Sequence, residues 1–393
     1  MANPSKISWW KAIKYWAITF CFFALLFEMA SSFIYKRRYA TKKLASVYLL
    51  EKLWGGKSGR ATSQDIPEKL RPDAPPALNR QIAAESWEAN TFAYEPWLQF
   101  KAADFMSEYV NVNGFERKSV PSTFVNPSSP DTLEVLFLGG STMYGYNMAD
   151  NETIPSCFLR LYEKKYPQGQ TLRVRNYGIP HYYSKQELLL LSKQVFEGKR
   201  PDIVVFLDGL TDFYPSRMLY YDRPYFSYAM QQVFDGKIFQ NANASIIDTS
   251  DQLYIDPPSV PAEKYYDALL EKYLNNIRQA SRLSERTGIN AYFFCQPVPF
   301  YNYPNRDKDP VCNKERHARF DHIYPLLEKK ADSIPNLVFL GNMLESENGL
   351  PFIDEVHYSP SFSESIAEKI LLKIEKDHFK TNEHAKEQIR QSH

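Results

Sequence analysis

The chain has 393 residues, of which 47 are Lys or Arg and 46 are Asp or Glu, so its formal net charge is +1. This balance excludes the strongly basic character on which nucleic-acid binding depends, and no nucleic-acid partner is expected. With 44% hydrophobic and 15% aromatic residues, the chain is too apolar to be disordered. Four cysteines are too few for a disulfide scaffold.

The first predicted element is a membrane span. Residues 15–35 (YWAITFCFFALLFEMASSFIY) carry Glu28 as their only charge and have aromatic residues at both ends. A helix of this length spans about 31 Å, close to the thickness of a hydrocarbon core. We predict one transmembrane helix here, after a flank over residues 1–14. The alternatives are a cleaved signal peptide, for which no small-x-small site follows, and a buried core helix.

The charges around this span leave its orientation open. Three lysines precede it, and five Lys or Arg residues follow it within residues 36–43. Counted this way, the positive-inside bias places the body in the cytoplasm. That conflicts with the extracytoplasmic, periplasmic-face location that we expect from the function inferred below.

Residues 36–130 lack long periodic runs. A basic and then polar stretch fits a juxtamembrane stalk, and the Pro-dotted, aromatic stretch that follows is typical of an irregular segment. We predict that this segment packs on the core without being a domain of its own.

From residue 131 to 378, short apolar runs alternate with amphipathic stretches. This alternation predicts an α/β fold, in which a five-stranded parallel sheet has helices on both faces. The runs predicted to be buried strands cover residues 133–138, 172–177, 203–207, 291–295 and 337–340.

Three helices have recognisable ends. Ser184 and Glu187 have the spacing of a capping box, which opens one helix. Residues 262–287 form a long amphipathic pattern that ends at Gly288. The sequence SFSE at 361–364 opens the last helix.

An aromatic-rich insertion is predicted over residues 213–260, and a polar tail over residues 379–393. Together with residues 292–303, the insertion either forms a wall or lid over the strand ends or packs an irregular subdomain against the sheet. Aromatic faces in a wall would suit sugar rings or acyl chains.

Ligands of parallel α/β sheets bind at the carboxyl ends of the strands. The sequence GGST at 139–142 follows the first predicted strand, and its glycines permit a sharp turn that exposes the Ser141 hydroxyl. The alternative is a tight or phosphate-binding turn, although neither nucleotide motif fits. Gly178, which permits close backbone approach, follows the second strand, and DGLTD at 208–212 follows the third.

Asp354 and His357 precede the last predicted helix. A carboxylate three residues before a histidine on a turn can reach its Nδ1 and leave Nε2 facing a nucleophile, as in a Ser-His-Asp triad. Taken alone, the pair also fits a helix N-cap beside a surface histidine.

The ordered set resembles the SGNH (GDSL-type) hydrolase superfamily. The set consists, in chain order, of a serine after strand one, a glycine after strand two, Gly-x-x-Asp after strand three and Asp-x-x-His before the last helix. The resemblance covers residues 111–373 and extends to NGF at 113–115 and to Gln296 with the proline after it. A hydrophobic span with a late glutamate, here Glu28, is similar to membrane-anchored bacterial members. The resemblance implies a flavodoxin-like three-layer sandwich.

The resemblance also implies a role for each matching residue. Ser141 resembles the nucleophile, His357 the general base and later acid, and Asp354 the residue that orients the histidine. The backbone N–H groups of Ser141 and Gly178 are implied as two arms of an oxyanion hole. The family's third arm is an asparagine side chain, and Thr211 stands at that position. The threonine side chain can donate one hydrogen bond from its hydroxyl, but it is shorter than an asparagine side chain and its β-branch restricts its rotamers.

Candidate pocket residues are His181, Asp212 and Gln296. His181 also fits a loop histidine, and Asp212 cannot donate a hydrogen bond while ionised. No cluster has metal-ligand spacing, so we predict no metal and no cofactor. Three cysteines lie beyond the span, so at most one pair can form, with Cys295 and Cys312 as the candidates.

The function implied by the resemblance is a membrane-anchored serine esterase or deacylase. Its partner would be an acylated carbohydrate or envelope ester, with acetyl as the first acyl group to consider. One alternative is an O-acyltransferase that works with a membrane-protein partner. The other is a non-catalytic module that binds a glycan or a partner, which the departure at Thr211 motivates.

Overall fold

The computed structural model describes residues 71, 75–120, 132–213, 262–314 and 317–379, with isolated positions between 16 and 28. The chain divides into two units, one of residues 1–62 with 242–245 and one of residues 63–241 with 246–393. Within the described residues, no helix has the length and apolar character needed to cross a membrane. Most of the predicted span over 15–35 lies outside them.

The second unit contains one large sheet in the order β10-β9-β8-β6-β7-β5-β4-β3. Its strands are β3 Phe105–Met106, β4 Asn111–Asn113, β5 Glu116–Arg117, β6 Leu133–Gly139, β7 Leu172–Gly178, β8 Ile203–Asp208, β9 Asn290–Cys295 and β10 Leu337–Phe339. Strands β6 to β10 pair in parallel. Numbered along the chain, these five have the flavodoxin-like order 2-1-3-4-5. The five predicted strands and their parallel pairing are confirmed.

Of the segment over 36–130, which we predicted to be irregular, the structure describes residues 71 and 75–120, and these include regular elements. After the helix α3 (Pro76–Ala89) comes a separate hairpin of β1 (Phe92–Glu95) and β2 (Gln99–Ala102). The next three strands are antiparallel and extend the sheet beyond β7. The five strands of this segment are two to four residues long. A pattern that short carries almost no periodic signal.

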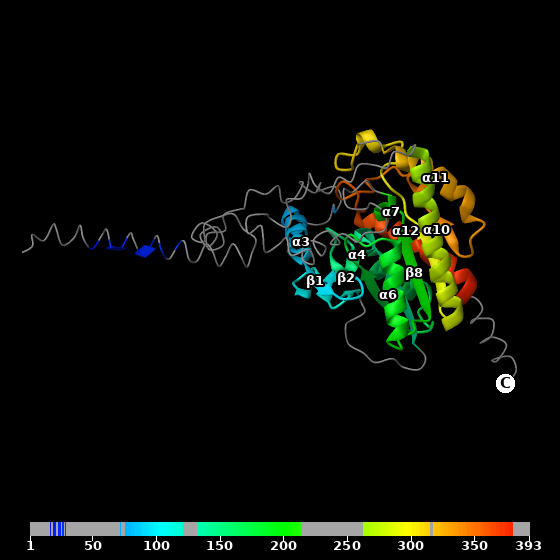
Figure 1. Cartoon of the computed structure of the whole chain (residues 1–393), viewed down its shortest axis with the longest axis horizontal. Coiled ribbons are helices and arrows are strands. Elements are labelled where there is room, and N and C mark those ends of the chain that lie inside the picture. Colours follow the sequence, from blue (N-terminus) through cyan, green and yellow to red (C-terminus); the bar gives the residue numbers. More distant parts are fainter. Residues whose placement is uncertain are drawn as a thin grey trace, which may run out of the picture. The chain divides into compact units, whose positions relative to one another are not determined.

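Helices lie on both faces of the parallel strands (Figure 1). The α-helices beyond α3 are α4 Ser141–Tyr144, α5 Ile154–Lys165, α6 Ser184–Phe196, α7 Leu210–Phe213, α10 Ala262–Thr287, α11 Ala318–Ala331 and α12 Pro360–Ile374. Shorter 3-10 helices are η2 Asp150–Glu152, η3 Arg306–Lys308 and η4 Gly341–Leu344, and η5 Glu375–Phe379 is a π-helix. The three-layer arrangement agrees with the predicted sandwich.

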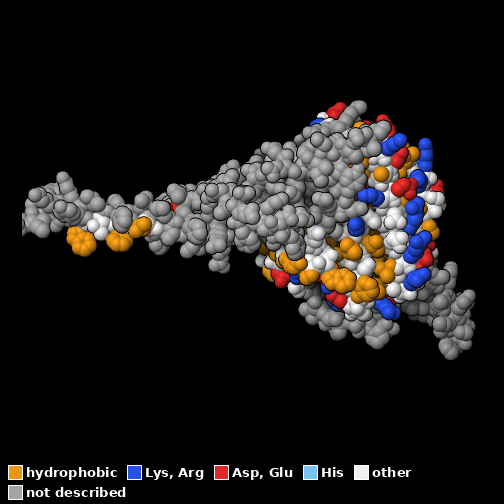
Figure 2. Space-filling model, in the orientation of Figure 1, with side chains coloured by type: hydrophobic (Ala, Val, Ile, Leu, Met, Phe, Trp, Pro, Cys, Tyr) orange, Lys and Arg blue, Asp and Glu red, His pale blue; other side chains and the backbone are white. Residues whose placement is uncertain are grey.

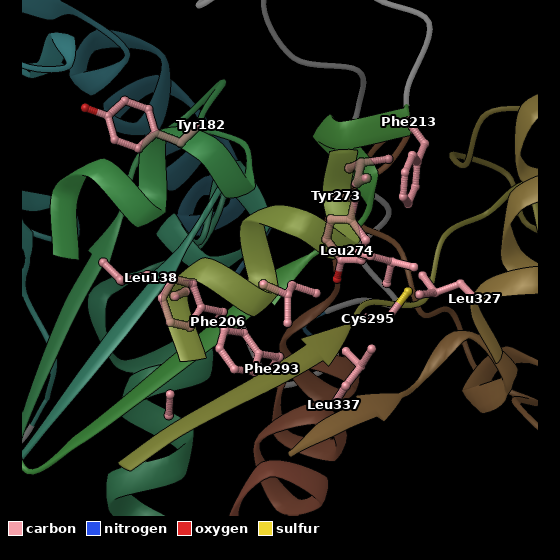
Figure 3. Close-up of a cluster of buried hydrophobic side chains, with 14 of the residues drawn as sticks. Leu138, Tyr182, Phe206, Phe213, Tyr273, Leu274, Phe293, Cys295, Leu327 and Leu337 are labelled. Atoms are coloured by element: carbon pink, nitrogen blue, oxygen red, sulfur yellow. The ribbon is translucent and has the colours of Figure 1, made fainter. Parts of the chain in front are cut away.

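Two hydrophobic cores lie on opposite faces of the sheet. One packs the strands against α6, α10 and α11, and the other packs them against α5 and α12. Figure 3 shows Leu138, Phe206 and Phe293, from three neighbouring strands, gathered in the first core. Because successive side chains alternate between faces that are both buried, these strands have uninterrupted apolar sequences.

The capping box predicted at Ser184 is wrong, although a helix does begin there. Ser184 is the first residue of α6, and its hydroxyl donates to Asp212 Oδ1 at 2.5 Å. Glu187 is fully buried, and burial, together with the nearby Asp208, raises the pKa of its carboxyl well above the usual value. The last helix begins earlier than predicted, with Ser359 as its N-cap.

The candidate disulfide is not formed. Cys295 and Cys312 are both free and buried. Cys295 belongs to the core beneath α10 and α11, whereas Cys312 belongs to the core beneath α5 and α12. The sheet therefore separates the two sulfur atoms.

Most aromatic side chains of residues 292–303 pack the interior rather than forming a wall, and Tyr301 is partly exposed. Tyr292, Phe300 and Tyr303 are each at most 8% exposed. The insertion predicted over 213–260 lies outside the described residues, apart from its first residue.

Charges on the surface of this unit are mixed in sign. On the face shown in Figure 2, basic and acidic side chains lie beside one another over the described part. Lys199, for example, pairs with Glu197, and Lys330 pairs with Glu271. Exposed pairs contribute little to stability. Their mixture agrees with the near-zero net charge.

The end of β7 at Gly178 allows a stability prediction. A Cβ atom there would lie 2.3 Å from the Tyr144 backbone nitrogen, which cannot swing aside as a flexible side chain does. We expect Gly178→Ala to lower the free energy of unfolding by about 3 kcal/mol, the upper end of the overpacking range. Urea denaturation measures it. At Gly349 the nearest atom is the terminal carboxylate of Glu347, so Gly349→Ala should change stability by roughly 0.5 kcal/mol or less. Equal effects would contradict the prediction.

Candidate active site

The turn between β6 and α4 presents the Ser141 side chain. Gly140 is the N-cap of α4, and Ser141 is its first residue. A Cβ on Gly140 would lie 3.0 Å from both the Thr211 hydroxyl oxygen and the Tyr182 carbonyl oxygen. Only glycine fits comfortably between these two loops. As the first residue of a helix, Ser141 has a backbone N–H without an intrahelical acceptor.

The structure brings Ser141, His357 and Asp354 together in one hydrogen-bonded series. Ser141 Oγ lies 2.8 Å from His357 Nε2. On the other side of the ring, His357 Nδ1 lies 2.8 Å from each carboxylate oxygen of Asp354. The His357 and Asp354 side chains are 16% and 13% exposed, so the series lies just below the surface. The Asp-x-x-His pair is therefore neither a helix cap nor a surface histidine.

Asp354 is stabilised as a carboxylate. Burial raises the pKa of its carboxyl, but the His357 ring and hydrogen bonds from the backbone N–H groups of Val356 and His357 outweigh burial, so the pKa lies below its usual value. Those two N–H groups donate to Oδ1 at 3.1 and 2.9 Å. An ionised Asp354 can accept a hydrogen bond from Nδ1–H and so hold Nε2 toward Ser141.

Two further rings lie near His357. The Tyr146 ring lies 4.9 Å from it between centroids. Burial, and then the charge of Asp354, raise the pKa of Tyr146 to about 12. His181 has a left-handed backbone, and burial, together with the nearby His357, lowers its pKa to about 4. Both rings are therefore neutral at pH 7. The His181 ring packs against Phe92, with ring centroids 5.7 Å apart, and its place in a substrate pocket stays a prediction.

One of the predicted oxyanion donors is wrong. The Gly178 backbone N–H donates to Asn176 Oδ1 at 2.9 Å, so its hydrogen bond goes to a residue at the end of the same strand, β7. Asn176 also donates to the Met143 carbonyl at 3.0 Å, which ties β7 to α4. The predicted donors that remain are the Ser141 N–H and the hydroxyl of Thr211, whose oxygen lies close to Gly140, the residue before the serine.

Two predicted pocket residues have partners within the fold. Asp212 accepts hydrogen bonds from the Ser184 hydroxyl and N–H, which joins α7 to the start of α6. Gln296 is 2% exposed and accepts a hydrogen bond from the Thr142 hydroxyl at 2.8 Å. It fixes α4 against the end of β9. Within the described ranges, no three His, Cys, Asp or Glu side chains are grouped as metal ligands would be.

No model of a known protein family matches the chain, and no curated protein matches it. Among solved structures, it is similar to a lipolytic protein of the G-D-S-L family from Desulfitobacterium hafniense. The identity is 12% and the TM-score 0.35, over 61% of this chain and 98% of that one. It is also similar to an acetylxylan esterase from Geobacillus stearothermophilus, with 16% identity and a TM-score of 0.36, over 62% and 94%. A third is an esterase from a Pseudoalteromonas species, with 13% identity and a TM-score of 0.33, over 62% and 97%. Because these identities and TM-scores are low, the function is argued below from the geometry of the site.

Two residues of the site have no counterpart in the sequence prediction. Asn147 donates from Nδ2 to Asp354 Oδ2 at 2.6 Å, and Arg71 donates to the Asn147 carbonyl at 3.1 Å. Asn147 is 207 residues away from Asp354 in sequence. No local sequence pattern indicates such a contact. The one local feature is that the backbone at residue 147 is left-handed, a conformation that asparagine adopts more readily than most residues.

Proposed function

We propose that this chain is a serine esterase of the SGNH type. It would remove an acyl group from a carbohydrate or envelope component, and acetyl is the first acyl group to test. In this proposal residues 15–35 anchor it in a membrane, and the second unit faces the extracytoplasmic side. The observation that carries the esterase is the series of 2.8 Å contacts from Ser141 through His357 to Asp354.

Acylation begins when Ser141 Oγ attacks the carbonyl carbon of the ester. Its proton passes to His357 Nε2, and the imidazolium that forms is stabilised by the Asp354 carboxylate. The carbonyl oxygen becomes an oxyanion, to which the Ser141 N–H and the Thr211 hydroxyl can donate. Collapse of this intermediate breaks the bond to the alcohol oxygen, which takes the proton from His357. The alcohol leaves and an acyl-serine remains.

Deacylation repeats these steps with water. His357, now neutral, removes a proton from a water molecule as its oxygen attacks the acyl carbon. The second oxyanion collapses, Ser141 Oγ leaves and regains a proton from His357, and the carboxylic acid is released. A sugar hydroxyl in place of water would give acyl transfer by the same steps.

Labelling with a fluorophosphonate tests the proposal, because the probe bonds covalently to an activated serine. We expect the folded full-length chain to take up one label, with peptide mass mapping placing it on Ser141, and to hydrolyse p-nitrophenyl acetate until it is labelled. The urea-unfolded chain is the control and should take up none. A folded chain with neither labelling nor turnover would contradict the esterase and leave a non-catalytic binding module.

Thr211 gives a separate prediction about the oxyanion. Thr211→Val keeps the shape of the side chain and removes the hydroxyl, so we expect kcat to fall by roughly 10²–10³-fold. KM should change little, because this hydrogen bond strengthens in the transition state. Thr211→Ser retains a hydroxyl and should keep most of the activity. Steady-state kinetics on p-nitrophenyl acetate measures both. Wild-type rates in Thr211→Val would exclude this hydroxyl from the mechanism.

A further inference from the structure

Asp354 receives a hydrogen bond from outside its own turn. Its Oδ1 accepts the N–H groups of Val356 and His357, which follow it in sequence. Its Oδ2 accepts Asn147 Nδ2 at 2.6 Å, a short, charge-assisted contact. The turn itself is tied to other parts of the fold, for example by the Asn313 N–H, which donates to the Glu355 carbonyl, and the His357 ring reaches Ser141. The Asn147 amide adds a direct bond between the Asp354 carboxylate and the loop that follows Ser141.

Asn147 lies on the loop that carries the nucleophile. The N–H groups of Gly145 and Tyr146 both donate to the Ser141 carbonyl at 3.1 Å, so the loop folds tightly back on the start of α4. Asn147 has φ +62°, a left-handed conformation that asparagine tolerates better than most residues. One short loop therefore holds both the serine hydroxyl and the amide that reaches Asp354.

Arg71 fastens this loop to the segment that precedes the sheet. Its guanidinium donates to the Asn147 carbonyl, to both carboxylate oxygens of Glu152, at 2.6 and 2.5 Å, and to Asn79 Oδ1 at 2.8 Å. Arg71 is 6% exposed. The planar guanidinium suits such simultaneous contacts, whereas a lysine ammonium would satisfy fewer of them. Asn79 belongs to α3, so the helix, η2 and the loop meet at one side chain.

We propose that Asn147 is a positioning residue of the active site, which orients the Asp354 carboxylate, and that Arg71 holds Asn147 in place. The inference rests on the proposed esterase function and adds to it that the segment before the sheet helps to align the catalytic residues. Neither residue touches the reacting atoms. Both act through Asp354 and His357, and so on kcat rather than on substrate binding.

The test compares two substitutions of Asn147 in the full-length chain. Asn147→Gly accepts the left-handed backbone and removes the amide, so we expect kcat to fall roughly tenfold to a hundredfold with little change in KM. Asn147→Asp keeps the size of the side chain, but its carboxyl can donate to Asp354 only when protonated. Its activity relative to wild type should therefore fall further as pH rises from 5 to 8, whereas the deficit of Asn147→Gly should be nearly constant.

Arg71 is tested through its coupling to Asn147. Arg71→Lys keeps the positive charge but loses the planar array of guanidinium N–H donors, so we expect kcat to fall severalfold. If Arg71 acts through Asn147, the double variant with Asn147→Gly should lose little more than Asn147→Gly alone. Independent, additive losses would overturn the part of the proposal that concerns Arg71.

The controls separate this inference from the proposed function. Asn336 also has a left-handed backbone and uses its amide on the Ala291 carbonyl, away from the site, so Asn336→Gly should keep wild-type kcat. Thermal unfolding of each variant shows whether it is folded. A folded Asn147→Gly chain with wild-type kcat, or deficits with the same pH dependence in both Asn147 variants, would overturn the inference while the esterase stands. Absence of turnover and of labelling in wild type would overturn the esterase itself.

Discussion

Ser141→Ala is expected to lower ester turnover by about 10⁶-fold, as removal of a triad nucleophile does. The hydroxyl is the atom that forms the acyl-enzyme, and no other group of the site replaces it in the proposed mechanism. Ser141 Oγ contacts His357 Nε2 at 2.8 Å, so the base loses its proton source as well. The N–H of residue 141 and the Thr211 hydroxyl would still stabilise an oxyanion, which leaves a small residual rate. Hydrolysis of p-nitrophenyl acetate and fluorophosphonate uptake measure the loss.

A matched serine substitution controls for general damage. Ser365 lies on α12, and its hydroxyl donates to the Ser361 carbonyl one turn earlier. Ser365→Ala should therefore retain wild-type turnover and labelling. If Ser141→Ala kept its activity, or if the label mapped to another residue, the assignment of the nucleophile would be wrong.

Asp354→Asn is expected to lower kcat by about 10⁴-fold. A neutral amide cannot stabilise the imidazolium as a carboxylate does, and its NH₂ group facing Nδ1 favours the tautomer with its proton on Nε2. His357 would then be unable to remove the serine proton. Steady-state kinetics measures the loss, and Asp307→Asn, at an exposed position on η3, is the control that should retain activity. A loss of less than about tenfold would contradict the orienting role.

The same substitution has a signature in stability. Because the fold lowers the pKa of Asp354, its ionised carboxylate contributes stability that is present above the usual carboxyl pKa, about 3.9, and is lost as pH falls below it. Asp354→Asn removes this contribution. The difference in unfolding free energy between wild type and variant should therefore narrow below about pH 4. Urea denaturation over pH 3 to 7 measures it.

The strands and the site differed in how far local sequence predicts them. Each central strand is an apolar run buried on both faces, so its own residues identify it, as LEVLFL does for β6. The long helix at Ala262–Thr287 was predicted with its bounds, because an amphipathic period and Gly288 mark it. The strands before residue 120 are too short for such a signal. β5 pairs with the edge of β7, and β4 and β3 follow it in the sheet, whereas β1 and β2 pair only with each other.

Polar residues show why motif reading stops short of the site. Ser184 and Glu187 have the spacing of a capping box, yet Ser184 bonds Asp212 and Glu187 is buried beside Asp208. Gly178 stands where an oxyanion donor was expected, but the side chain of Asn176 occupies its N–H. In each case the polar group has a hydrogen-bond partner or neighbour other than the one that the motif predicts.

The sequence alone established the α/β class, the order of the strands along the chain and the candidates Ser141, Asp354 and His357, because apolar periodicity and strand-end position are local properties. Only the tertiary structure decided the partner of each polar atom. Asn147 reaches Asp354 across 207 residues, and Arg71 reaches Asn147 across 76. Contacts at such separations depend on how the sheet stacks its loops, and the free energy that selects them comes from the packing of the whole core.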